Sequence, residues 1–77
     1  MNSEQWAHDG HFGERVVQLR TRLGLSRQEL GEKADIDRTT IFHYEKGGRL
    51  PKTGIHLRGL SEALESTPGF LLLGEED

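Results

Sequence analysis

The strongest constraint on the fold of this chain is a pair of short amphipathic segments, residues 26–34 and 37–46, with only two residues between them. Ser26 followed three residues later by Glu29 is the sequence pattern of a capping box, which begins a helix. Asp37 is a favourable N-cap for the second segment. The pattern predicts two short helices joined by a turn that holds them in contact.

The residues around this turn support the prediction. Asp35 tolerates the left-handed backbone conformation that such a turn needs, and Ile36 is placed to enter the core. Gly31 lies where the first helix of the pair should touch its partner, because a missing side chain permits close approach.

The second helix of the pair has two unlike faces. At about 100° per residue, Ile41 and Tyr44 lie on one edge, whereas Thr39, His43 and Lys46 point the other way. One edge is suited to a core, and the opposite edge is typical of a helix that enters a DNA groove.

Three further helices are expected around this pair. An apolar stripe predicts the first, and Gly24 ends it as a left-handed cap residue. The stripe consists of Phe12, Val16, Leu19 and Leu23. A fourth helix is predicted from Ile55, Leu57, Leu60 and Leu64. Thr67 followed by Pro68 opens a short fifth helix. No strand alternation or internal repeat is found, so the expected class is all-α.

Charge is unevenly distributed along the chain. The formal net charge is −3, which taken alone argues against nucleic acid. However, all ten Lys and Arg residues lie in residues 15–58, together with only five Asp and Glu, so this span carries +5 between two acidic ends. A basic centre fits a phosphate-binding face, and it also fits an ordinary solvated surface of mixed charge.

Size and composition exclude several classes of protein. Seventy-seven residues suffice for one domain with a modest core, and the absence of cysteine excludes disulfides and thiolate metal sites. No apolar run approaches the roughly 20 residues of a membrane span, and the first ten residues lack the apolar stretch of a signal peptide. We expect a cytoplasmic protein with no membrane association, a flexible tail at residues 1–11 and one domain at residues 12–77.

The expected tail leaves two alternatives open. Trp6 would either pack back on the domain, which we favour, or lie at a partner surface. His8, Asp9 and His11 form a loose cluster of metal-binding residue types, but two His and one Asp in a tail are weak grounds for a metal site. We predict neither a metal nor another cofactor.

The ordered set of residues resembles the Cro and lambda-repressor-like helix-turn-helix family, also called the XRE family. The resemblance covers residues 12–75. Its matching segments are residues 12–15, 24–26, 29–30, 32–34, 38–41, 44–47, 49–51, 62–64, 68 and 71–75. The chain departs from the family pattern at Arg27, Gly31, Asp35 and Phe42, and it is one residue longer around residues 52–55. The resemblance implies a compact five-helix lambda-repressor-like domain that contains the helix-turn-helix.

The resemblance further implies that the helix at residues 37–46 lies in the major groove of double-stranded DNA. Arg38, Thr39, Phe42 and His43 would then face base edges, Arg38 with a phosphate as its alternative. Phe42 would either lie against a thymine methyl group or pack under the first helix or the loop that follows. The alternative for His43 is a solvated surface histidine.

A second set of residues would contact backbone phosphates, and such contacts position a protein but carry little sequence information. These residues are Ser26, Arg27, Lys46, Arg49 and Lys52. The resemblance also places Arg20 and Glu45 as a partly buried ion pair that ties the first helix to the third.

One module of this size buries too little surface for tight binding alone, so we expect a homodimer on a two-fold operator. The apolar run Phe70, Leu71, Leu72 and Leu73 exceeds what one short amphipathic helix buries. It is the candidate dimer surface, unless all four residues cap the core.

The expected function is that of a sequence-specific DNA-binding transcriptional regulator of bacterial or phage type. The alternative is a protein-interaction module or antitoxin of the same fold, with weak or no DNA binding of its own. An enzyme is not expected. Ser26 and His43 are the only tempting pair, and no third residue completes a set of nucleophile, base and orienting group.

Overall fold

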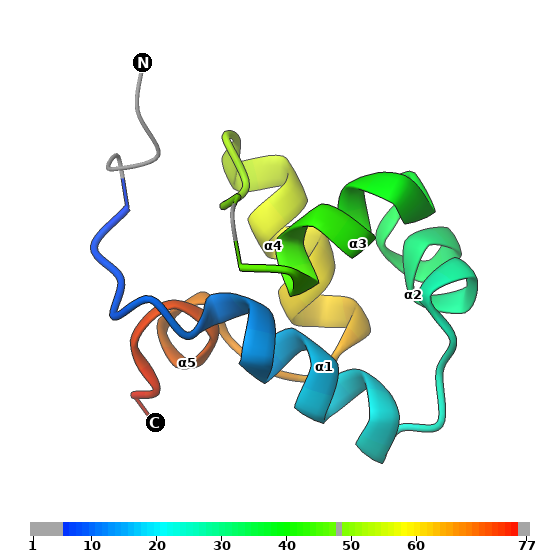
Figure 1. Ribbon diagram of the computed structural model, residues 1–77, viewed down its shortest axis with the longest axis horizontal. Coiled ribbons are helices and arrows are strands. Elements are labelled where there is room, and N and C mark those ends of the chain that lie inside the picture. The colour runs from blue at the N-terminus through cyan, green and yellow to red at the C-terminus, as the bar shows by residue number, and fades with distance from the viewer. Residues whose placement is uncertain (1–5, 48, 76–77) are drawn as a thin grey trace.

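The second to fifth helices each begin at a residue whose side chain caps the first turn, in a computed structural model that describes residues 6–47 and 49–75 (Figure 1). In chain order the helices are α1 (Phe12–Arg22), α2 (Arg27–Ala34), α3 (Arg38–Glu45), α4 (Gly54–Ala63) and α5 (Pro68–Leu73). The described ranges contain no strand, so the prediction of an all-α, five-helix chain is confirmed. No helix in these ranges is long and apolar enough to cross a membrane.

The predicted capping residues determine where α2 begins and ends and where α3 begins. The Ser26 hydroxyl accepts a hydrogen bond from the backbone N–H of Glu29 at 3.0 Å, and the Glu29 carboxylate accepts one from the N–H of Ser26 at 2.8 Å. Asp35 ends α2 in the left-handed conformation, with a φ of 59°. Asp37 then caps α3 by accepting a 2.8 Å hydrogen bond from the N–H of Thr39. The predictions for these caps and for the turn are confirmed.

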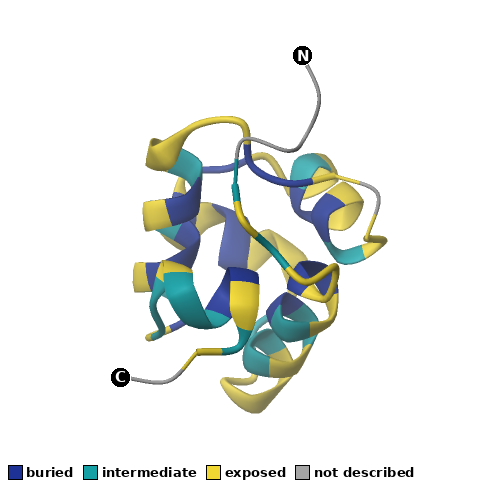
Figure 2. Ribbon diagram, turned by 90° about the vertical axis from the view of Figure 1, so that its left-hand side faces the viewer, coloured by how far each residue is buried: buried dark blue, intermediate teal, exposed yellow. Residues whose placement is uncertain are grey.

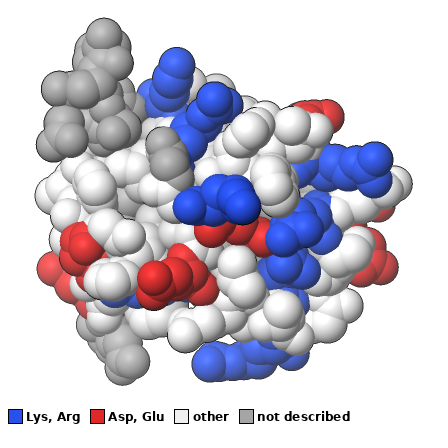
Figure 3. Space-filling model, in the orientation of Figure 1, with Lys and Arg blue, Asp and Glu red and all other residues white. Residues whose placement is uncertain are grey.

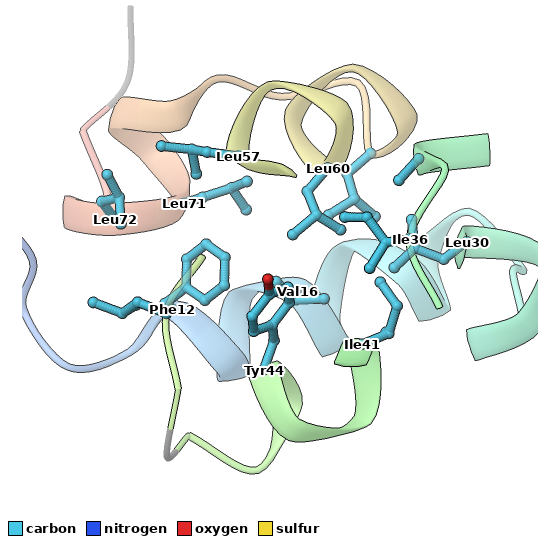
Figure 4. Close-up of a cluster of buried hydrophobic side chains, with 13 residues drawn as sticks. Phe12, Val16, Leu30, Ile36, Ile41, Tyr44, Leu57, Leu60, Leu71 and Leu72 are labelled. Carbon is cyan, nitrogen blue, oxygen red and sulfur yellow. The ribbon is translucent and has the colours of Figure 1, made fainter. Parts of the chain in front are cut away.

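Apolar residues from all five helices meet in one core (Figure 4). The cluster consists of Phe12, Val16, Leu30, Ala34, Ile36, Ile41, Tyr44, Leu50, Leu57, Leu60, Leu64, Leu71 and Leu72. Phe12 of α1 meets Tyr44 of α3 edge to face, with ring centroids 6.0 Å apart. Buried positions face the interior and exposed positions the outside (Figure 2). Full burial of one such side chain contributes roughly 1.5–3 kcal/mol, so α3 is held chiefly through Ile41 and Tyr44.

Two glycines allow the helices to approach closely. A Cβ atom on Gly31 would press on the backbone carbonyl of Ile36, which confirms the predicted need for a missing side chain there. A Cβ atom on Gly13 would press on the carbonyls of Tyr44 and Glu45. The first turn of α1 therefore lies directly against the last turn of α3.

Three expectations about apolar residues are wrong. Leu23 follows the last residue of α1 and is 37% exposed, and Ile55 is 81% exposed because it lies two residues before Leu57, on the opposite side of α4. Leu71 and Leu72 belong to the core of the single chain, so they are not available as the expected dimer surface.

Residues 6–11, part of the expected tail, lie against the domain. Trp6 packs against the core, and its indole N–H donates to the carbonyl of Pro51, which confirms the favoured placement of this side chain. The backbone N–H of Asp9 donates to the carbonyl of Leu72 at 3.1 Å. The segment therefore joins the α3–α4 loop to α5. The first five residues of the expected tail lie outside the described residues.

The acidic and imidazole side chains of this segment have partners within the chain. The Asp9 carboxylate accepts a 3.0 Å hydrogen bond from Arg15, and Arg15 also donates to the carbonyl of Leu71 at 3.2 Å. His11 Nδ1 lies 3.2 Å from a carboxylate oxygen of Glu14. Within the described ranges no group of three or more His, Cys, Asp or Glu residues could hold a metal ion.

One buried carboxylate joins three helices. The Glu45 side chain of α3 is 2% exposed, and its Oε2 lies 2.6 Å from Nε of Arg20 in α1. Its Oε1 lies 2.7 Å from Nε of Arg27 at the start of α2. Arg20 also donates to the carbonyl of Leu25 at 2.9 Å, so the ion pair implied by the resemblance is part of a larger network.

We expect Asp9→Asn to lower the free energy of unfolding at neutral pH and to matter less in acid. The hydrogen bond from Arg15 is the main cause that holds the pKa of the Asp9 carboxyl well below its usual range. Because the folded pKa lies below the unfolded value of about 3.9, the pair stabilises the fold above that pH, and the contribution is lost as pH falls toward the folded pKa. Urea titrations of Asp9→Asn and the wild type at about pH 6 and about pH 3 would measure whether the difference between their free energies of unfolding becomes smaller in acid. A constant Asp9→Asn deficit would contradict the linkage.

We expect Glu45→Ala to lower the free energy of unfolding by about 3 kcal/mol, because it leaves the Arg20 guanidinium without its carboxylate in a site where that side chain is 12% exposed. Arg27→Ala removes the other partner, which is 46% exposed, and should cost less than about 1 kcal/mol. Urea denaturation of both variants measures the difference. Equally small losses would show that the buried carboxylate does not hold the three helices.

Candidate nucleic-acid interface

The start of α2 and the first turns of α3 surround an open cleft of about 580 Å³. Its lining consists of Arg20, Ser26, Arg27, Gln28, Arg38, Thr39 and Phe42. Five of these residues belong to the predicted DNA contacts, three from the base-edge set and two from the phosphate set. The fold therefore brings part of each set together, whereas His43, Lys46, Arg49 and Lys52 do not line this cleft.

The outer edge of α3 presents the predicted base-edge residues to solvent. Arg38, Thr39, Phe42 and His43 are all exposed, whereas Ile41 beside them is fully buried. This separation follows from the helical period, because the buried edge and the exposed edge lie about half a turn apart. The helix itself ends at Glu45, with Lys46 as its C-cap residue.

Phe42 lies at the centre of the exposed edge and outside the core. The side chain is 38% exposed and does not belong to the core cluster. The guanidinium carbon of Arg27 lies 5.2 Å from the ring centroid, and the ammonium nitrogen of Lys46 lies 5.3 Å from it. His43 meets the ring edge to face at 5.8 Å. Two cations predicted to contact phosphate thus flank an aromatic ring predicted to contact a base.

The loop between α3 and α4 carries the remaining cations of the predicted phosphate contacts. Arg49 and Lys52 are exposed, while Leu50 and Pro51 between them are buried. Trp6 donates to Pro51, so the loop is held at its apolar residues and presents its basic ones outward. Arg49 does not line the cleft but a separate depression of about 70 Å³ beside Gly47.

Basic and acidic side chains are unevenly distributed over this face. Lys and Arg side chains gather over α2, over α3 and over the loop beyond it, with some acidic side chains among them, and further acidic side chains lie at the left of the same view (Figure 3). The net charge of −3 for the whole chain therefore conceals a locally basic face.

Sequence reasoning missed one residue of the cleft and one of its contacts. Gln28 lines the cleft and accepts a 3.4 Å hydrogen bond from Nη1 of Arg38. Its position in the first turn of α2, two residues before the buried Leu30, is the signal that would have indicated an outward side chain. The contact between Arg27 and Glu45 spans 18 residues, and no local pattern indicates it.

A further contact ties α3 to α4 behind the interface. The Tyr44 hydroxyl lies 3.0 Å from Nδ1 of His56, and burial raises the pKa of the Tyr44 phenol. The phenol therefore stays neutral under physiological conditions and completes a polar contact at the edge of the core.

Comparisons with known proteins agree with this geometry. Residues 16–71 match the helix-turn-helix family. The HTH-type transcriptional regulator DicA of Escherichia coli (strain K12) is 32% identical over 66 residues, which cover 86% of this chain and 48% of DicA. The chain therefore spans about half the length of this curated relative.

Two solved structures show the same arrangement of helices. The P22 c2 repressor protein in complex with synthetic operator 9T in the presence of Tl+ has a TM-score of 0.79 and 31% identity, and the match covers 83% of this chain and 96% of that chain. The restriction-modification controller protein C.AhdI from Aeromonas hydrophila has a TM-score of 0.73 and 32% identity, covering 82% and 94%. The fold is thus lambda-repressor-like, as expected.

The matched residues include the capped turn, the buried edge of α3 and the cleft between α2 and α3. The chain therefore belongs to the XRE-type helix-turn-helix family of DNA-binding transcriptional regulators.

Proposed function

We propose that this chain binds specific sequences of double-stranded DNA with α3 in the major groove, and that it regulates transcription by doing so. The single observation that carries the proposal is the cleft in which Arg27 and Ser26 of the α2 start lie beside Arg38, Thr39 and Phe42 of α3. Groups suited to phosphates and groups suited to bases occur there on one basic face.

The exposed edge of α3 supplies groups that distinguish base pairs. The Arg38 guanidinium can donate two hydrogen bonds to O6 and N7 of guanine, and the Thr39 hydroxyl and His43 imidazole can donate or accept at neighbouring edges. In the free chain Arg38 is exposed and bound only weakly, at 3.4 Å, to Gln28. It can therefore turn to a base without losing a strong contact.

The phosphates would be bound from both ends of this edge. The first backbone N–H groups of α2 lack partners within their helix, and the positive end of its dipole favours an anion. Arg27 adds a cation at this end, and Lys46, Arg49 and Lys52 add cations at the other end of α3. Contacts of this kind give affinity that depends on salt but little on sequence.

Tight binding would require two copies on a two-fold site. With Leu71 and Leu72 in the core, the apolar candidates for self-association on α5 are Leu73, which is 36% exposed, and the half-buried Phe70. We propose that these two residues contribute to a homodimer.

Selection of duplexes from a random pool tests the proposal directly. We expect enrichment of a two-fold sequence, with an affinity that falls steeply as salt rises. Enrichment of no sequence, together with salt-independent binding, would favour the alternative of a protein-interaction module or antitoxin with this fold.

We expect Arg38→Ala to weaken binding to the selected duplex by about 1–3 kcal/mol and to relax the preference at one base pair in each half-site. Repeated selection with the variant measures both effects. The matched control is Arg58→Ala on α4, where Arg58 lines a different depression beside Lys33. An unchanged base preference in Arg38→Ala would contradict the base-edge role.

We expect Lys46→Ala to weaken binding to all duplexes alike and to make the slope of log affinity against log salt shallower by about one unit. Titrations at several salt concentrations measure this slope. Lys33→Ala removes the same charge from the α2–α4 side and should leave the slope unchanged. A changed sequence preference with an unchanged slope would show that Lys46 faces a base and not a phosphate.

A further inference from the structure

Phe42 is an apolar side chain on a surface that is otherwise polar. It lines the cleft with hydroxyl, amide and guanidinium groups around it, and 38% of it is exposed. The core does not explain the presence of a phenyl ring there, because α3 is held through its opposite edge. The ring therefore has apolar area that only a bound partner would remove from water.

The position of this ring is set by two cations from different helices. Arg27 is itself held, since its Nε donates to the buried Glu45 carboxylate at 2.7 Å, and its guanidinium carbon lies 5.2 Å from the ring centroid. Lys46 approaches the ring at 5.3 Å from the C-terminal end of α3. Cations placed over an aromatic ring are attracted to it. If both also contact phosphates, the ring between them lies against the edge of the groove.

The chemistry of the major groove restricts what a phenyl ring can recognise there. A phenyl ring forms no ordinary hydrogen bond with the donors and acceptors of a base edge. The apolar group that this groove displays is the methyl group on C5 of thymine. The same methyl group is present on 5-methylcytosine and is absent from uracil and unmodified cytosine.

We propose that Phe42 contacts the C5-methyl group of one pyrimidine in each half-site, so that binding depends on whether that carbon is methylated. This inference rests on the proposed function and adds the chemical group that one residue recognises. It makes a thymine preferred at that position, and it makes cytosine methylation there a signal that the chain detects.

A thermodynamic cycle tests the contact, using the duplex selected in the random pool. Each thymine is replaced in turn by uracil, which removes only the methyl group, and binding is measured for the wild type and for Phe42→Ala. Burial of one such carbon is worth about 0.8 kcal/mol, which corresponds to about a fourfold loss of affinity. We expect this loss at one position per half-site in the wild type and no loss at that position in Phe42→Ala.

A second pair of duplexes separates the methyl group from the identity of the base pair. At the same position a C·G pair replaces the T·A pair, with and without a methyl group on C5 of the cytosine. The wild type should bind the methylated duplex about fourfold more tightly, and Phe42→Ala should bind both equally. Phe42→Leu keeps an apolar side chain and should keep part of the discrimination.

Two control variants distinguish the effect of Phe42 from that of the neighbouring Thr39 methyl group and from the general effect of shortening a side chain. Thr39→Ser removes the methyl group of a second residue on the same edge of α3 but keeps the hydroxyl, and it should leave the thymine-to-uracil loss unchanged. Ile55→Ala shortens a side chain that is 81% exposed on α4 and should leave both folding and binding unchanged. A loss that disappears in Thr39→Ser but persists in Phe42→Ala would assign the methyl contact to Thr39 and overturn the inference.

Failure of the methyl contact can be distinguished from failure of the proposed function. If the wild type binds its selected duplex in a salt-dependent way, and no methyl effect differs between wild type and Phe42→Ala, the inference alone is wrong. If the wild type selects no duplex at all, the proposed function is wrong and the methyl contact with it. Melting curves of Phe42→Ala should match those of the wild type, because the truncated side chain lies outside the core.

Discussion

One buried carboxylate links the first three helices, beside the apolar contacts of Ile41 and Tyr44 that hold α3 in the core. A carboxylate as enclosed as that of Glu45 is unfavourable without partners, because the charge loses its hydration. The fold provides two guanidinium groups, one from α1 and one from α2, and each donates through Nε at less than 3 Å. Since Glu45 is the last residue of α3, its two partners fix the end of this helix relative to both of its neighbours.

The same contacts organise the outer surface. Arg27 donates to Glu45 on its inner side and lies over Phe42 on its outer side. One side chain therefore contacts both the buried carboxylate and the ring that lines the cleft. The close approach at Gly13 acts in the same direction, because it brings α1 against the carbonyls of Tyr44 and Glu45. The cleft is thus shaped in the free chain. A DNA-binding surface of this kind loses less conformational entropy on association than one that must first be ordered.

Features that depend on neighbouring residues could be predicted from the sequence, and those that depend on distant residues could not. Ser26, Asp35 and Asp37 act through hydrogen bonds or backbone conformations within a few residues, so the helices and the turn were predictable. Periodicity marked the stripe of α1 but not its end, so Leu23 was counted as part of that stripe. The count of apolar residues in α5 could not show how many of them face inward.

In the candidate site, too, features that depend on neighbouring residues could be predicted and those that depend on distant residues could not. The outward edge of α3 follows from the helical period once Ile41 and Tyr44 are placed inside. The contact of Arg27 with Glu45, and that of Trp6 with Pro51, join residues 18 and 45 positions apart, and their geometry exists only in the folded chain. That Arg27 of α2 lies over the Phe42 ring was beyond prediction for the same reason, whereas Lys46 lies about one helical turn after Phe42 and is a local neighbour.

The division of α3 into two edges separates folding from recognition. Residues that place the helix, namely Asp37, Ile41, Tyr44 and Glu45, point to the core or to the caps, and residues 39, 42 and 43 make no contribution to that core. Substitutions on the outer edge are therefore nearly independent of substitutions on the inner edge in their effect on stability. In the proposed function, a chain built in this way can acquire a new preferred DNA sequence in single steps, each of which leaves a folded protein, so its specificity can diverge while its architecture stays the same.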